Sequence, residues 1–212
     1  YHIAKIMKAK KLQTPATIIY SGTASKILSI TDGSVDYNKL EKLTRLIFSK
    51  VYKDSDVSKI ELEQDKNPKE ITSKGGLLMD TSIEDIQDIK TVLLGDTEDT
   101  LIPQESFKYT DIENNPKLDS VVDEVQKFID TLFEIHEEFN FTNNFGVEAS
   151  QIDIYKEILE GKLRQHLNSG IENKIEELKG NDRINLEESL FFYPLVGALN
   201  TLAYKISTQE KN

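Results

Sequence analysis

Hydrophobic and polar positions in the first third of the chain alternate between helical and strand-like spacing. The pattern predicts, in order, a helix ending before Pro15, a strand at 16–20, a helix from Asp36 to Val51, a strand at 57–63 and a helix from Asn67. Asp36 is the residue type expected at a helix N-cap. This alternation favours an α/β layer in which neighbouring strands run parallel.

The pattern changes after residue 80. Short apolar runs at 90–94 and 106–110 predict two strands, joined by a turn-rich segment as a hairpin or across a long loop. From Lys117 onward three long apolar stripes follow a helical period, at 118–135, 152–178 and 186–206.

Three residues interrupt these helical stripes. Gly161 and Gly170 weaken the second stripe, because glycine is a poor helix former. Pro194 is expected to kink or split the third, because it lacks an amide hydrogen and its ring clashes with the preceding turn. The sequence therefore predicts a helix-rich protein with an α/β part at 1–80, a strand and loop connection at 81–116 and a mainly helical region at 117–212.

Composition adds a charge asymmetry to this division. The chain has 38% hydrophobic and 30% charged residues, as soluble globular proteins do, and a net charge of -11. Residues 1–80 carry +4 and residues 81–212 carry -15. Such an acidic second part repels phosphates and argues against a nucleic-acid partner. It serves solubility or forms an acidic docking surface, and solubility is the simpler interpretation.

The chain has no cysteine, which excludes disulfides and thiolate metal sites and fits a reducing compartment, so we expect a cytoplasmic protein. His2, His136 and His166 have no ligand-like spacing, so no metal site is predicted. The sequence contains no run of about 18 apolar residues, so no membrane span is predicted. The opening residues also lack the apolar core of a signal peptide.

Two motifs in the α/β part suggest a ligand-binding site. In the first, the strand at 16–20 leads into the small-residue turn Ser21-Gly22-Thr23-Ala24-Ser25 and then into a helix start at Lys26. Small side chains let a ligand approach the backbone, and the first amides of a helix favour anions. The second motif runs from Asn67-Pro68, a capped helix start, to Gly75-Gly76. Alone, each is compatible with an ordinary connection.

Together, in this order, the two motifs resemble those of the actin-like and heat-shock-chaperone ATPases, which share a ribonuclease-H-like fold. Ser21 to Ser25 is similar to the adenosine turn of that family, with Ser21 in place of the first of two glycines. Asn67-Pro68 and Gly75-Gly76 match a later family pattern. The resemblance covers roughly residues 1–80.

This resemblance implies that ATP or ADP with Mg²⁺ binds in the full-length protein, in a cleft between two lobes. The expected contacts from this chain are Ser21, Gly22, Thr23, Ser25 and Lys26. The family's phosphate loops and catalytic carboxylates lie in earlier segments, and nothing in this sequence resembles them. The chain is therefore expected to hold no catalytic residue, to be inactive alone, and to partner the remaining lobe of the ATPase.

The alternative hypothesis is a noncatalytic interaction or assembly module on a degenerate ATPase scaffold. The segment 190–199 is densely apolar. It forms either core of the helical region or a surface for a protein partner or self-association. In the core interpretation, Gly197 and Ala198 allow a second helix to approach closely.

Overall fold

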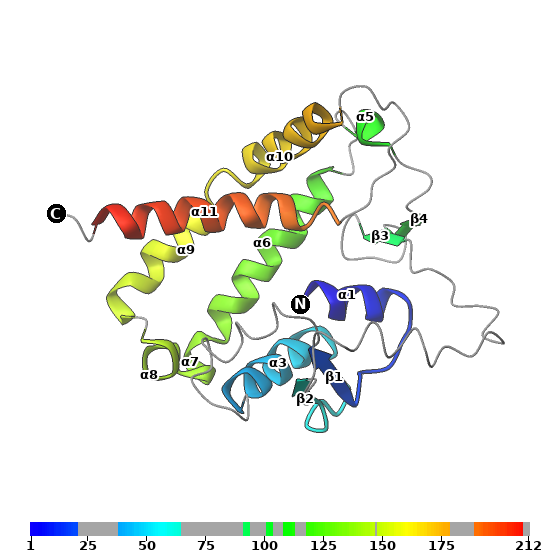
Figure 1. Ribbon diagram of the computed structural model, residues 1–212. Coiled ribbons are helices and arrows are strands. Elements are labelled where there is room, and N and C mark those ends of the chain that lie inside the picture. Colours follow the sequence, from blue (N-terminus) through cyan, green and yellow to red (C-terminus); the bar gives the residue numbers. More distant parts are fainter. Residues whose placement is uncertain are drawn as a thin grey trace.

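The computed structural model describes residues 1–20, 38–64, 91–93, 101–103, 108–112, 118–146, 148–178 and 189–209. The chain begins with a small α/β part and continues into a larger group of packed helices (Figure 1). This is the helix-rich architecture that the sequence predicts, with its small sheet in the N-terminal part.

The α/β part contains α1 (His2–Ala9), β1 (Thr17–Tyr20), α3 (Asn38–Val51) and β2 (Glu61–Gln64). Strands β1 and β2 pair in parallel, with α3 in the connection between them. The predicted order of helix, strand, helix and strand is therefore confirmed, as is the parallel pairing. The predicted N-cap Asp36 and the helix from Asn67 lie outside the described residues.

Two boundaries in this part differ from the prediction. Helix α1 ends well before Pro15, because Lys11 adopts a left-handed conformation (φ 57°) and the amide of Leu12 bonds back to the carbonyl of Met7 at 2.9 Å. Strand β2 begins at Glu61, because Asp56 accepts a bond from the amide of Ser58 at 3.0 Å and holds the preceding residues in a turn.

The connection contains an antiparallel pair, β3 (Thr91–Leu93) and β4 (Leu101–Pro103). This pairing supports the hairpin alternative, but the predicted second strand at 106–110 is wrong. Tyr109 instead opens a short helix, α5 (Tyr109–Ile112). Tyr109 and Ile112 are three positions apart, so a helical turn can place both in the core, where they are almost fully buried.

The helical region follows the predicted stripes. Its elements are α6 (Leu118–Glu134), α7 (His136–Phe139), α8 (Phe141–Phe145), the 3₁₀ turn η4 (Ala149–Gln151), α9 (Ile152–Glu160), α10 (Leu163–Glu177) and α11 (Phe192–Gln209). The second stripe divides at Gly161 and Lys162, where Lys162 takes a left-handed conformation, whereas Gly170 remains inside α10.

The predicted kink at Pro194 is wrong. Pro194 is the third residue of α11, whose first-turn amides have no partner within the helix. Proline is tolerated in a first turn for that reason. The helix therefore begins at Phe192 and continues unbroken to Gln209.

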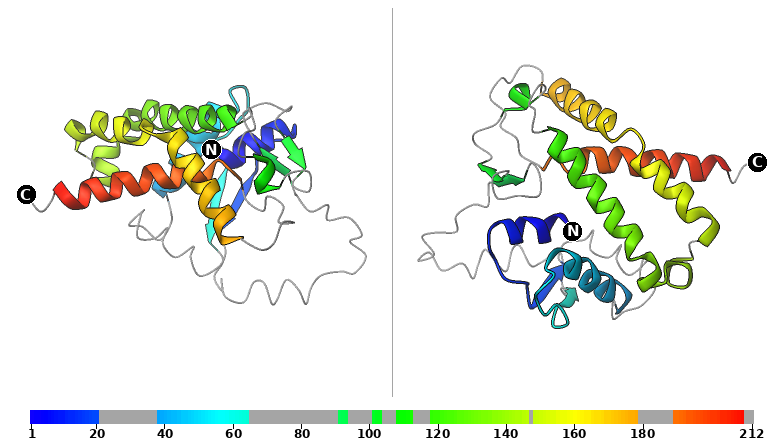
Figure 2. Two further views of the ribbon diagram at one scale, coloured as in Figure 1. Left: turned by 90° about the horizontal axis from the view of Figure 1, so that it is seen from above. Right: turned by 180° about the vertical axis from the view of Figure 1, so that it is seen from behind.

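Three buried clusters hold the fold together. One lies in the α/β part and includes Ala4 and Phe48. The other two lie between α6, α9, α10 and α11, where Leu163, Leu167 and Ala198 are buried. Figure 2 shows α1 and α3 on one side of α6, and α10 and α11 on the other. Among the described residues, no helix is long and apolar enough to cross a membrane.

Candidate functional site

The structure describes the chain up to Tyr20, the residue before the predicted nucleotide turn. Ser21, Gly22, Thr23, Ser25 and Lys26 lie outside the described residues, and so do Asn67-Pro68 and Gly75-Gly76. The strand that leads into the turn is described. β1 ends at Tyr20, the residue immediately before Ser21, and Tyr20 stands opposite Gln64, the last residue of β2.

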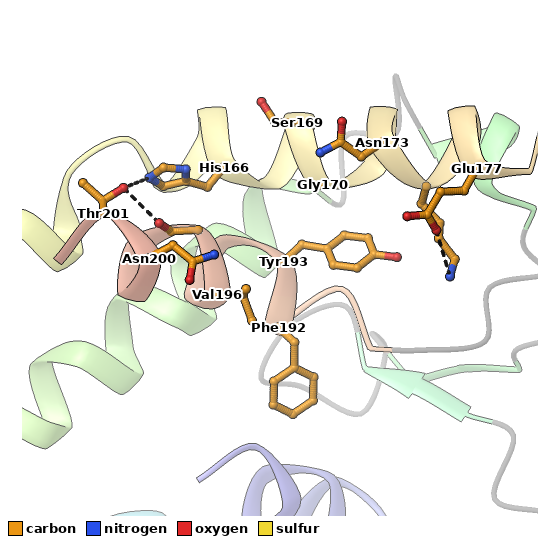
Figure 3. Close-up of a pocket in the computed structure, with 12 residues that line it drawn as sticks. His166, Ser169, Gly170, Asn173, Glu177, Phe192, Tyr193, Val196, Asn200 and Thr201 are labelled. Atoms are coloured by element: carbon orange, nitrogen blue, oxygen red, sulfur yellow. Dashed lines mark hydrogen bonds and ion pairs between the residues drawn. The ribbon is translucent and has the colours of Figure 1, made fainter. Parts of the chain in front are cut away.

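A cavity of about 700 Å³ lies between α10 and α11 (Figure 3). Its walls include His166 and Asn173 from α10, and Tyr193 and Thr201 from α11. The hydroxyl of Thr201 donates to the carbonyl of Gly197 at 2.9 Å and lies 3.4 Å from Nε2 of His166. These polar side chains give the cavity hydrogen-bonding groups, so it differs from a purely apolar pocket.

Two glycines allow the helices to approach at this cavity. A Cβ atom built on Gly197 would lie 2.5 Å from Cγ of His166, and one on Gly170 would lie 2.9 Å from Cβ of Tyr193. Real Cβ atoms essentially never approach so closely. The expected close approach at Gly197 is therefore confirmed, and the partner is α10. Burial of His166 lowers the pKa of its imidazole, and the charge of Lys162 lowers it further.

The apolar segment at 190–199 divides between core and surface. Leu190, Phe191 and Ala198 are buried. Phe192, Val196 and Leu199 are 46%, 51% and 47% exposed, respectively. These last three residues, spaced by four and three positions, lie on one face of α11 beside the cavity, and we call them the α11 stripe. In Figure 3 the side chain of Phe192 points away from α10.

A buried polar cluster joins three distant segments. Nδ1 of His2, on α1, lies 2.9 Å from Oε1 of Glu124, on α6. Nε2 of His2 lies 2.6 Å from the hydroxyl of Ser189, just before α11. The imidazole also stacks on Phe191, with ring centroids 4.4 Å apart. His2 and Glu124 are 5% and 1% exposed.

Carboxylate, imidazole and hydroxyl in this series form the arrangement that activates a serine nucleophile in hydrolases. Catalysis also requires room for a substrate beside the serine. Among the described residues, neither the cavity between α10 and α11 nor a second one between α1, α3 and α6 is lined by His2, Glu124 or Ser189. We therefore interpret the cluster as a polar connection between α1, α6 and α11. Sequence reasoning missed it because its members are 122 and 187 positions apart.

Within the part of the chain that the structure describes, no three His, Asp or Glu side chains come together as a metal site. His2, His136 and His166 lie on three different helices. The chain matches no protein-family model, no curated protein and no solved structure.

Proposed function

We propose that this chain is the C-terminal portion of an actin- or chaperone-type ATPase. It supplies the adenosine-facing side of a nucleotide cleft and is not catalytic alone. Ser21, Gly22, Thr23, Ser25 and Lys26 contact ATP or ADP with Mg²⁺ in the full-length protein, whose remaining lobe provides the phosphate and metal chemistry. The absence of cysteine supports a cytoplasmic location.

One observation carries this proposal. In the register of the parallel pair, Tyr20 and Gln64 stand opposite each other at the carboxyl edge of the sheet. Ser21 follows Tyr20 directly, and Asn67 follows Gln64 after two intervening residues. Both motifs therefore leave the sheet from the same edge. Ligands of parallel α/β sheets bind at the carboxyl ends of the strands, so this placement supports a shared nucleotide site.

The proposal predicts that Gly22→Val weakens ADP binding in the full-length protein by at least about tenfold, because a branched side chain fills the space that the ligand needs. Isothermal titration calorimetry in the presence of Mg²⁺ measures the affinity. Ala16→Val is the matched control, since Ala16 is exposed just before β1 and its side chain lies outside the turn.

Circular dichroism shows that both variants are folded. If folded Gly22→Val protein binds ADP as tightly as wild type, Ser21 to Ser25 is only a connection between two elements. The nucleotide proposal is then wrong, and the assembly module becomes the preferred function.

The second candidate, a noncatalytic interaction or assembly module, is favoured by the α11 stripe. Three large apolar side chains about half exposed on one helical face are typical of a helix that packs against another protein. The adjacent cavity offers a partner polar groups such as Asn173 and Thr201. In this function the stripe mediates self-association of the chain.

This candidate predicts that the wild-type chain forms a dimer and that Val196→Asp abolishes it, because a buried unpaired carboxylate opposes the apolar contact. Sedimentation velocity over a range of concentrations measures the mass. Thr208→Asp is the control, because it adds the same charge at an exposed polar position of α11 outside the stripe. A wild-type chain that remains monomeric at its highest soluble concentration contradicts self-association through the stripe.

A further inference from the structure

The cavity between α10 and α11 is formally neutral in a chain that carries -11. Among the described residues that line it, Lys174 and Glu177 are the charged ones, and Nζ of Lys174 lies 3.8 Å from Oε2 of Glu177. Burial lowers the pKa of the His166 imidazole from its ordinary value, so this side chain is neutral at pH 7. A charged ligand therefore meets no excess of opposite charge in the cavity, and the lining favours an uncharged one.

Carboxamide groups stand on both walls of the cavity. Asn173 belongs to α10 and Asn200 to α11, and both residues are exposed. In Figure 3, dashed lines join Thr201 to His166 and to Gly197, but among the residues drawn there none reaches Asn173 or Asn200. A carboxamide offers two N–H donors and an acceptor oxygen. The two amides can therefore bond to a ligand from opposite walls.

The cavity also has a fixed aromatic surface. The ring of Tyr193 lies between the two helices (Figure 3), where a Cβ atom built on Gly170 would be 3.0 Å from its Cγ. The hydroxyl of Tyr193 donates to that of Tyr109 at 3.1 Å, so the ring is held at both ends. Phe192 and Val196, about half exposed, add apolar surface to the lining. The cavity therefore combines apolar surface with hydrogen-bonding groups and carries no net charge.

We propose that this cavity binds a small uncharged sugar. A sugar ring presents C–H groups on its faces and hydroxyls around its rim. The faces can lie on Tyr193 and Val196, and the hydroxyls, each of which donates and accepts, can bond to Asn173 and Asn200. The volume of about 700 Å³ is within the range of about 300–1,000 Å³ that is usual for small-molecule sites. None of the lining residues belongs to the turn at Ser21 to Lys26, so the site is independent of the proposed nucleotide turn.

The experiment measures binding of cellobiose, maltose and lactose to the 212-residue chain by saturation-transfer difference NMR. These uncharged disaccharides differ in linkage and in the orientation of their hydroxyls, and at least one of them should bind saturably. The double variant Asn173→Ala/Asn200→Ala is expected to bind that sugar at least about tenfold more weakly, because it removes the hydrogen bonds of two amides. Alanine is the best helix former, so the variant should keep both helices.

Asn143→Ala/Asn168→Ala is the matched control, because it makes the same change at two exposed asparagines outside the cavity, and Asn168 lies on α10 itself. It should bind the sugar within about twofold of wild type. Circular dichroism checks the folding of both variants. The uncharged peptide acetyl-triglycine amide is tested in the same way. A wild-type chain that binds none of the disaccharides, equal losses in the two double variants, or tighter binding of the peptide than of every disaccharide overturns the proposal.

Discussion

Replacing Gly197 with leucine is expected to lower the free energy of unfolding by about 3 kcal/mol, at the upper end of the usual cost of overpacking. Its Cβ would lie 2.5 Å from Cγ and 2.6 Å from Cβ of His166. These are atoms near the backbone of α10, so a simple rotamer change of His166 does not remove the clash. The two helices must therefore move apart, and this movement disrupts the buried contacts of Ala198.

Urea denaturation followed by circular dichroism measures this loss as a lower midpoint with an unchanged slope. Ala203→Leu is the control, because it places the same leucine side chain at an exposed position of the same helix. Its stability should change by no more than about 0.5 kcal/mol. Leucine is a better helix former than glycine, by about 0.8 kcal/mol. An unchanged or higher midpoint for Gly197→Leu would show that propensity outweighs packing and that the two helices are not in close contact.

His2→Ala is expected to cost about 3 kcal/mol, the upper end of the usual cost of removing one partner of a buried hydrogen bond. The substitution removes one hydrogen-bond partner, 2.9 Å away, from the buried carboxyl group of Glu124. It also removes the stack on Phe191 and the ring nitrogen that lies 2.6 Å from the Ser189 hydroxyl. Thermal or urea unfolding measures the loss.

A double-mutant cycle tests whether the carboxylate is the cause. Replacing a buried polar pair by apolar residues is often nearly neutral, so the double variant His2→Ala/Glu124→Leu should be more stable than His2→Ala alone. Lys59→Ala is the control, because Lys59 is exposed and pairs with Asp56 at 3.8 Å. It should change stability by no more than about 0.5 kcal/mol. Additive effects of the His2 and Glu124 substitutions would contradict the coupling.

The parts of the fold that were predictable are those specified by neighbouring residues. The β-branched run before Tyr20 and the apolar period of α6 need only a local pattern, and both elements form as expected. Tyr109 to Ile112 shows the limit of this reasoning. A run of five residues is compatible with either a strand or a helical turn, and burial against Leu118 and Leu167 accompanies the helical turn.

The candidate sites were less predictable, because their residues are joined only by tertiary packing. Gly197 signals a close helix contact in the sequence, but nothing local identifies His166 as its neighbour. The lysines that line a second cavity, among them Lys5, Lys50 and Lys127, come from three helices that no local pattern connects. The turn at Ser21 to Lys26 is the opposite case, a site proposed from local sequence whose residues the structure does not describe.

The contact of His2 with Ser189 also bears on the timing of folding during synthesis. Ala4 can pack against α3 as soon as the chain up to Val51 has left the ribosome. The imidazole of His2, the first residue of α1, must wait longer, because Ser189 is made 187 residues after it and Phe191 follows Ser189. Contacts of such sequence separation slow folding. Helix α1 therefore acquires these neighbours only after Ser189 and Phe191 have been made, and until then that face of α1 lacks them.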